Sequence, residues 1–220
     1  MSKLLGEVSL PKLIYRGAEA EIYLQDWYGS PAVRKSRIPK PYRVPELDST
    51  IRRTRTLHET TLMHEARRIG VPVPAIQHLD TESSSFIMEY VKGPTLREEL
   101  YVVSPEIRRR RCTELGRLVA LMHEGGLVHG DLTISNVLSD GGKLFLIDFG
   151  LGNFSTELED RGVDLLLLNR AMKSTHVKFH EEIFGAFLKG YLTIAGGKLH
   201  RETIGKMREI ERRGRYFERT

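Results

Sequence analysis

The sequence predicts an α+β fold of two lobes: a small N-terminal lobe with an antiparallel sheet and one helix, and a reduced, mainly helical C-terminal lobe. The length of 220 residues suits one large domain or two small lobes. Most strand-like patterns lie before residue 91, whereas helical periodicity dominates after it. We therefore assign residues 1–91 and 92–220 to the two lobes of one domain.

In the N-terminal lobe, short runs of β-branched and aromatic residues predict strands. The predicted strands are a pair within Lys12–Leu24 around the turn Arg16–Glu19, then Pro31–Lys35, Ala75–His78 and Ser85–Val91. A helix is expected from Pro45 to about Ile69, because apolar residues recur at near-helical spacing until Gly70. Four of the nine prolines fall between Pro31 and Pro45, which predicts a stiff loop that presents basic side chains.

In the C-terminal lobe, the first long helix is expected to begin at Pro105, with Ser104 as its N-cap, and to end at Gly125. A hairpin with a turn at Ser139–Gly142 follows it. The strands of this hairpin are Val137-Leu138 and Leu144–Ile147. After it, apolar periodicity predicts further helices at Arg161–Met172, His180–Leu192 and Leu199–Arg213.

The composition, 40% hydrophobic and 29% charged residues, excludes collagen, coiled coil and wholesale disorder. No segment predicts a signal peptide or a membrane span, since Asp164 interrupts the most apolar run. The lone Cys112 excludes an intrachain disulfide, so the expected location is the cytoplasm. The positive charge is clustered, which favours an RNA or acidic partner only weakly, because solvated helix faces carry similar runs. The clusters are Arg34–Arg55, Arg108–Arg111 and Arg208–Arg219.

The strongest functional signal is an ordered pair of motifs around the hairpin. His129-Gly130-Asp131 precedes Asn136 by four intervening residues, and Asp148-Phe149-Gly150 follows the hairpin. Phosphoryl transfer from Mg-ATP needs a carboxylate facing the acceptor hydroxyl and oxygen ligands that hold metal against the phosphates. Each motif alone could be a turn or a strand end. Together they predict a protein-kinase-like fold, with Asp131 as the catalytic carboxylate and Asn136 and Asp148 as ligands of Mg²⁺ or Mn²⁺.

Such a fold also requires residues upstream. Lys35 lies on the third predicted strand, where a lysine would bind the α- and β-phosphates. A carboxylate on the next helix must hold this lysine, and Glu59 and Glu65 are both candidates. The strand around residues 86–91 has the pattern of a hinge that binds adenine through its backbone, although an ordinary buried strand has the same pattern. The hinge candidates are Met88, which would guard the pocket, and the backbone groups of Glu89 and Val91.

The chain departs from ordinary protein kinases in three ways. Gly17-Ala18-Glu19-Ala20 stands where a glycine-rich phosphate loop is expected. Gly130 removes the arginine that would pair with a phosphorylated activation loop. Only 72 residues follow Asp148 in the 220-residue chain, so a peptide-docking platform must be trimmed.

These departures fit a family. Over nearly its whole length the chain resembles the atypical small serine/threonine kinase and ATPase of the KEOPS complex, which makes threonylcarbamoyladenosine on tRNA. In that family the helix glutamate precedes a terminal Gly-Val by eleven residues, which selects Glu59 because Gly70-Val71 ends the helix here. The resemblance rests on Gly17–Ala20, Lys35–Asp48, Arg52, Gly130–Asn136, Ile147–Leu151 and Arg213–Arg215.

The resemblance implies an ATP site that uses Lys35, Glu59, Asp131, Asn136 and Asp148. It implies serine/threonine autophosphorylation, protein phosphorylation and ATP hydrolysis that supports tRNA modification. The implied partners are a threonylcarbamoyl-transferase subunit and a small regulatory subunit, with tRNA reached through the complex. Candidate partner or tRNA contacts are Lys40, Arg43, Arg52, Arg53, Arg213 and Arg215.

Three alternatives stay open. A RIO-type kinase is similar in size, and a small-molecule kinase of the aminoglycoside type also favours His-Gly-Asp. A pseudokinase scaffold that binds tRNA phosphates is the alternative without catalysis.

Overall fold

The structure, a computed structural model, describes residues 11–217, and the side chains as far as Arg213. The chain divides into two compact units. The first contains the residues up to His64 together with Pro74–Tyr90, and the second contains Glu65–Val73 and the residues from Val91 onward.

The first unit is built on a five-stranded antiparallel sheet with the order β1-β2-β3-β5-β4. The strands are β1 (Lys12–Arg16), β2 (Ala20–Trp27), β3 (Ser30–Arg37), β4 (Ile76–Asp80) and β5 (Ser85–Glu89). β3 is the middle strand, and its register sets Lys35 opposite Ile22 on β2 and Phe86 on β5. The predicted antiparallel sheet is therefore present, with β2 and β3 longer than expected.

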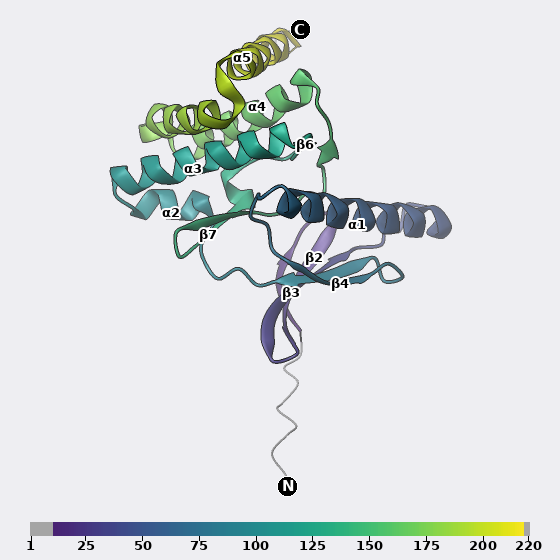
Figure 1. Ribbon diagram of the computed structural model, residues 1–220. Coiled ribbons are helices and arrows are strands. Elements are labelled where there is room, and N and C mark those ends of the chain that lie inside the picture. Colours follow the sequence, from purple (N-terminus) through teal and green to yellow (C-terminus); the bar gives the residue numbers. More distant parts are fainter. Residues whose placement is uncertain (1–10, 218–220) are drawn as a thin grey trace. The chain divides into compact units, whose positions relative to one another are not determined.

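Helix α1 (Pro45–Arg68) lies beside this sheet (Figure 1). Its buried face was expected to be apolar throughout, but Leu47 is 54% exposed. In the part that belongs to the first unit, Leu62 and Met63 are buried, and the other buried side chains are all polar: Asp48, Thr56, Glu59 and Thr60. A buried polar group is tolerated only where it has partners. These partners form part of the site below.

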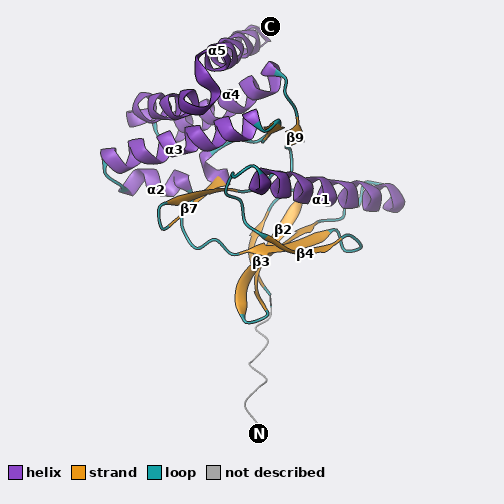
Figure 2. Ribbon diagram, viewed as in Figure 1, coloured by secondary structure: helices purple, strands orange, loops and turns teal. Residues whose placement is uncertain are grey.

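The second unit is mainly helical (Figure 2). Its helices are α2 (Leu96–Val102), α3 (Pro105–Glu124), α4 (Leu158–Thr175) and α5 (His180–Phe217), with the 3₁₀ helices η1 (Ile134–Asn136) and η2 (Val177–Phe179). Its strands are β6 (Leu127–Val128), β7 (Val137–Asp140), β8 (Lys143–Leu146) and β9 (Asn153–Phe154). Helices α3 and α4 both pack against α5. The core between them includes Leu115, Val119, Leu165, Leu168, Phe187 and Tyr191.

Two features of this unit differ from expectation. Helix α2 was not predicted, although Thr95 and Glu98 form a complete capping box at its start and Leu96 and Leu100 are buried. The two helices expected after His180 form the single element α5, with a kink at Gly196, where φ is +70°. That kink lies in the gap between the two predicted helices. Among the described residues, no helix is long and apolar enough to cross a membrane.

Candidate active site

In the first unit, a buried lysine and a buried glutamate face each other. Lys35 Nζ on β3 lies 2.6 Å from Glu59 Oε1 on α1, and their side chains are 8% and 1% exposed. The other candidate, Glu65, pairs instead with Arg68 at 2.7 Å. The structure therefore brings Lys35 to Glu59, the residue that the family resemblance selects.

The turn Gly17–Glu19 between β1 and β2 is braced by the segment that follows β3. The Lys40 ammonium donates to the Ala18 carbonyl, and Ile38 N donates to the Glu19 carbonyl at 3.0 Å. Arg55 on α1 pairs with the Glu19 carboxylate at 3.0 Å. The proline-rich segment was expected to present its basic side chains to a partner. Lys40 instead binds the chain's own backbone.

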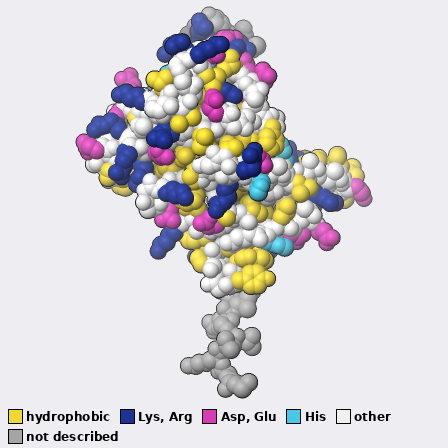
Figure 3. All heavy atoms as spheres, viewed as in Figure 1, with side chains coloured by type: hydrophobic (Ala, Val, Ile, Leu, Met, Phe, Trp, Pro, Cys, Tyr) yellow, Lys and Arg dark blue, Asp and Glu magenta, His cyan; other side chains and the backbone are white. Residues whose placement is uncertain are grey.

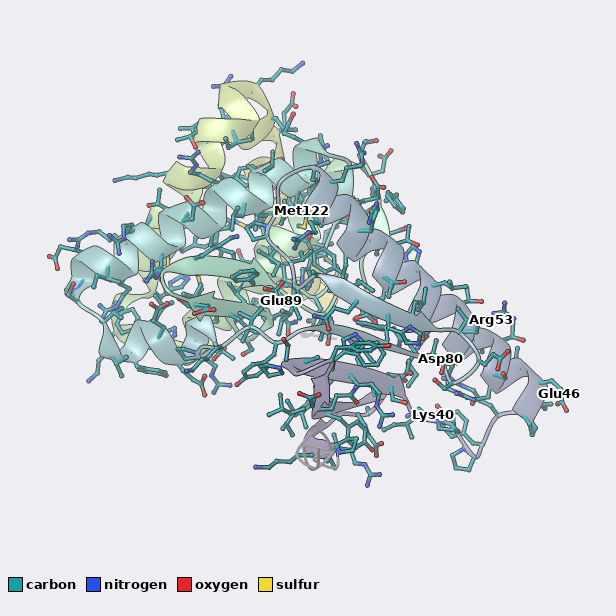
Figure 4. The ribbon with its side chains drawn as sticks, turned by 60° about the horizontal axis from the view of Figure 1, so that its bottom comes forward. Lys40, Glu46, Arg53, Asp80, Glu89 and Met122 are labelled. Atoms are coloured by element: carbon teal, nitrogen blue, oxygen red, sulfur yellow. The ribbon has the colours of Figure 1, made fainter. Side chains whose placement is uncertain are left out.

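Asp48 organises the basic residues at the start of α1. It is 3% exposed, and it accepts hydrogen bonds from Arg52 at 2.7 Å, Lys40 N at 3.2 Å and Arg43 at 3.4 Å. The hydrogen bond from Arg52 is the main reason why the pKa of Asp48 lies below its ordinary value of 3.8. Arg53 is exposed on the same helix (Figure 4). Of the four basic residues proposed here as partner contacts, Arg53 is thus the one best placed to meet a partner.

We expect Arg52→Met to lower the melting temperature by about 2–4 °C, whereas Arg53→Met leaves it unchanged. A carboxylate whose pKa is lowered by folding stabilises the fold above its ordinary pKa, and the contribution is lost as the pH falls through the lowered value. The difference in melting temperature between the wild type and Arg52→Met should therefore be largest near pH 7 and shrink as the pH falls below 3.8, the ordinary pKa of Asp48. Thermal unfolding of both variants and the wild type between pH 3 and pH 7 measures this; a difference that did not change with pH would contradict it.

The hinge candidates lie at the end of β5, where Met88 is opposite Val33 on β3 and Ile76 on β4. The Glu89 N–H already donates to the Ala75 carbonyl at 2.9 Å. Because this N–H is already engaged, the Glu89 carbonyl is the backbone group through which the predicted contact with adenine would form. Val91 begins the part of the second unit that follows β5 and is 6% exposed.

In the second unit, Asp131 and Asn136 are held together. The Asn136 Nδ2 donates to the Asp131 carbonyl at 2.9 Å and to Asp131 Oδ2 at 3.0 Å. Helix η1 makes this possible, because its single turn brings the two ends of the loop together. With Nδ2 turned to Asp131, the amide oxygen is the atom left for a cation.

His129 connects this loop to the strand that precedes Asp148. Its ring is fully buried, with Nε2 3.0 Å from the Ile147 carbonyl and Nδ1 3.4 Å from Asp131 N. A carbonyl can only accept, so Nε2 carries the proton and Nδ1 accepts. Asp148 itself has φ +63°, a left-handed conformation that is uncommon outside glycine, and accepts from Gly150 N at 3.3 Å.

Asp164 on α4 binds the backbone of His129 and Gly130, which directly precede Asp131. It is 0% exposed and accepts from His129 N at 2.7 Å and Gly130 N at 2.8 Å. His123 Nε2 donates to it at 3.2 Å, and the other ring nitrogen lies 3.0 Å from the Tyr191 hydroxyl. Sequence reasoning did not assign Asp164 a role, although its position within an apolar run was a signal for a buried, partnered carboxylate.

Gly130 is required by a close approach of two backbone segments. Its φ is +75°, and a Cβ placed there would lie 2.0 Å from the Leu151 carbonyl oxygen. No side chain fits that space without moving the Leu151 backbone. This explains physically why the middle residue of His129-Gly130-Asp131 is glycine rather than arginine.

We expect Gly130→Ala to destabilise the second unit and to reduce ATP turnover by at least about tenfold. Gly141→Ala is the matched control, because Gly141 also has a positive φ, +55°, but nothing lies within 4 Å of its added Cβ. That control should cost only about 1–2 kcal/mol from its left-handed conformation. Chemical unfolding and turnover of both variants test this, and equal losses would mean that the approach to Leu151 is not limiting.

The predicted metal ligands are one carboxylate, Asp148, and one amide, Asn136. In the part of the chain that the structure describes, no three His, Cys, Asp or Glu side chains gather into a metal site. This donor set fits Mg²⁺, which binds through one or two carboxylates and completes its shell with phosphate oxygens and water. It does not fit a structural zinc site.

The remaining basic clusters are largely satisfied within the chain. Arg108 lies over the Phe179 ring at 3.8 Å, Arg109 pairs with Glu182 at 3.0 Å, and Arg111 pairs with Glu99 at 3.0 Å. On the face shown in Figure 3, lysine and arginine side chains alternate with acidic ones. Arg108, Arg109 and Arg111 thus have partners within the chain, and the side chains of Arg108 and Arg111 are each only 12% exposed.

In the C-terminal cluster, Arg213 is paired within the chain. Arg213 lies 2.7 Å from Glu159 and 3.3 Å from Glu209. The side chain of Arg215, and all of Arg219, lie outside the described residues. The structure therefore leaves the predicted contact of Arg215 untested.

Comparison with known proteins gives the class first. Residues 35–152 match the family model of the RIO domain. The chain is similar in structure to Rio2 kinase from Chaetomium thermophilum, solved as an ADP/Mg²⁺-phosphoaspartate complex, with a TM-score of 0.62 and 17% identity over 90% of this chain and 70% of that one. The predicted two-lobed, protein-kinase-like fold is confirmed, and the chain is an atypical, RIO-type member of that class.

The particular family follows from the curated relatives. The chain is 46% identical over 215 residues to KEOPS complex subunit Bud32 of Pyrococcus abyssi, covering 95% of this chain and 98% of that protein. It is 41% identical over 206 residues to a probable bifunctional tRNA threonylcarbamoyladenosine biosynthesis protein of Methanothermobacter thermautotrophicus, of which it spans 37%. The chain belongs to the Bud32 family, and the resemblance inferred from the sequence is confirmed.

Proposed function

We propose that this chain transfers the γ-phosphoryl group of Mg-ATP to serine or threonine and hydrolyses ATP, in support of tRNA threonylcarbamoyladenosine synthesis within a KEOPS complex. The observation that carries the proposal is the buried Lys35–Glu59 pair, at 2.6 Å, together with the Asp131–Asn136 pair, at 3.0 Å. Holding polar groups in a fixed geometry away from water costs free energy, so we interpret both pairs as parts of a functional site.

Each residue has a distinct part in the proposed reaction. Lys35 binds the α- and β-phosphates, and Glu59 fixes its direction. Asp131 would accept the proton of the attacking hydroxyl or water, and Asn136 and Asp148 would hold Mg²⁺ or Mn²⁺. The bound metal would neutralise the negative charge that develops on the transferred phosphoryl group.

The remaining part of the proposal concerns the residues that would contact the nucleotide. Gly17–Ala20 would cover the phosphates, and Met88, Glu89 and Val91 would receive the adenine. The Rio2 structure, solved with ADP and Mg²⁺, supports this pair of ligands as the cofactors for the fold.

The setting comes from the relatives. Their names assign one to the KEOPS complex and another to threonylcarbamoyladenosine biosynthesis. We propose the same role for this chain and place it in the cytoplasm, with a threonylcarbamoyl-transferase subunit and a small regulatory subunit as partners and tRNA reached through the complex. Among the candidate contacts whose side chains the structure describes, Arg53 is the one that no hydrogen bond or ion pair described above already uses.

The test follows the γ-phosphate of labelled Mg-ATP with the purified chain, alone and with a transferase partner and tRNA. Label on protein serine or threonine in the isolated chain, and free phosphate in the assembly, is the expected result. Label on protein under both conditions would favour a dedicated protein kinase. No turnover under either condition would leave the pseudokinase scaffold, and transfer to an added small molecule would favour the aminoglycoside type.

A further inference from the structure

We propose that Arg37 is a positioning residue of the nucleotide site, which holds Glu59 in place and keeps the Lys35 ammonium available to the phosphates of a bound nucleotide. This inference rests on the proposed function, because it assigns Lys35 to phosphate. It concerns a residue that neither the catalytic motifs nor the hinge includes.

The geometry divides one carboxylate between two cations. Lys35 Nζ lies 2.6 Å from Glu59 Oε1, and Arg37 Nη2 lies 2.5 Å from Glu59 Oε2. All three side chains are at most 8% exposed. Lys35 and Arg37 share a face of β3 because successive side chains of a strand alternate. Each oxygen of Glu59 therefore faces its own cation.

Arg37 also fastens the helix that carries Glu59. Its Nη2 lies 3.4 Å from the carbonyl of Arg55, about one helical turn before Glu59. Its own backbone N–H donates to the Ser84 carbonyl at 3.1 Å, and Thr56 on α1 reaches the same carbonyl through its hydroxyl at 3.3 Å. Arg37 thus connects β3, the β4–β5 turn and helix α1 at one point.

Two consequences follow for Lys35. The guanidinium occupies Glu59 Oε2, so the carboxylate cannot turn to offer both oxygens to the lysine. Because the charge of Glu59 is shared, it attracts the ammonium less strongly than it would in an isolated pair, which leaves more of that charge for a phosphate. A buried arginine suits this role better than a lysine, because its guanidinium remains charged and its Nη2 reaches both Glu59 Oε2 and the Arg55 carbonyl.

The experiment compares Arg37→Met with Arg37→Lys, and uses Arg34→Met as the matched control. Arg34 carries the same charge on the same strand, but it belongs to the opposite face, where its guanidinium lies 4.8 Å from the centre of the Tyr23 ring. For each protein, kcat and KM for Mg-ATP, the affinities for ATP and for adenosine, and the thermal unfolding curve are measured. Adenosine lacks phosphates, so it reports on the adenine site alone.

We expect Arg37→Met to lower kcat/KM by about 10–100-fold and to weaken ATP binding while adenosine binding is unchanged. Arg37→Lys should recover part of the ATP affinity, and Arg34→Met should match the wild type. The inference is wrong if Arg37→Met binds and turns over ATP as the wild type does, or if it loses ATP and adenosine equally, which a merely structural role would produce.

The outcome also separates this inference from the proposed function. A wild type that binds neither ligand would overturn both. A wild type that binds ATP without turning it over would fail as an enzyme, but its ratio of ATP to adenosine affinity would still decide the role of Arg37. Normal wild-type turnover with an unaffected Arg37→Met would overturn the role of Arg37 alone.

Discussion

Replacing Asp148 by alanine is expected to abolish metal-dependent ATP turnover, with kcat lower by about 10³-fold or more. Asp148 is the only carboxylate among the proposed metal ligands, and Asn136 offers just a neutral amide oxygen. Without Asp148 the Mg²⁺ would lose its charged protein ligand and, with it, its fixed place against the phosphates. Phosphate release measured across a Mg²⁺ titration, repeated with Mn²⁺, gives the result.

Two further variants make this prediction specific. Asp148→Asn keeps the size of the side chain and an oxygen that can accept from Gly150 N, which lies 3.3 Å from Asp148 Oδ1. Its turnover should fall nearly as far, because the charge is what the metal requires. Asp140→Ala removes an exposed carboxylate from the β7–β8 hairpin of the same unit and should change nothing. Normal turnover in Asp148→Ala would mean that the metal is held by other residues.

The sequence was sufficient for features that depend on local order along the chain. The catalytic motifs, the hairpin between them and the long helices follow from spacing and periodicity, and the structure has each of them. The pairing of Lys35 with Glu59 was accessible because the family resemblance supplied a helix position that periodicity alone left open between Glu59 and Glu65. Where spacing along the chain or a family resemblance fixes the position of a residue, sequence reasoning works.

It was less informative about which charged side chains are buried together. The run of basic residues around Lys40 and Arg52 was interpreted as weakly favouring an RNA or acidic partner. Asp48 lies within that run and received no role, yet it is 3% exposed and accepts from Lys40 N and from Arg52. The same limitation hid Arg37, whose carboxylate partner lies 22 residues further on.

Helix α2 illustrates a different limitation. Gly93 and Pro94, just before it, favour a turn, and a helix of seven residues is too short for periodicity to outweigh that signal. The helix forms because Thr95 and Glu98 cap its first turn and because Leu96 and Leu100 are buried. Burial of this kind depends on packing within the unit, which a local pattern does not contain.

Replacing Asp164 by alanine is expected to destabilise the protein by about 3 kcal/mol or more and to remove most ATP turnover. The carboxylate accepts from His129 N at 2.7 Å, Gly130 N at 2.8 Å and His123 Nε2 at 3.2 Å, and it is fully buried. Without it, three donors lose a buried acceptor, and each unmade bond costs about 1–3 kcal/mol. The two backbone donors belong to the loop that positions Asp131, so the damage reaches the proposed catalytic carboxylate.

Asp164→Asn separates stability from positioning. It keeps the size of the side chain and one acceptor oxygen, but it turns an NH₂ group toward a donor, so turnover should fall by about 100-fold in protein that is still folded. Asp160→Asn is the matched control on the same helix, since Asp160 is exposed and only accepts from the Ser155 hydroxyl at 2.6 Å. Urea unfolding and turnover are measured on all three variants. If Asp164→Asn kept both stability and turnover, the hydrogen bonds to His129 and Gly130 could not be what sets the position of Asp131.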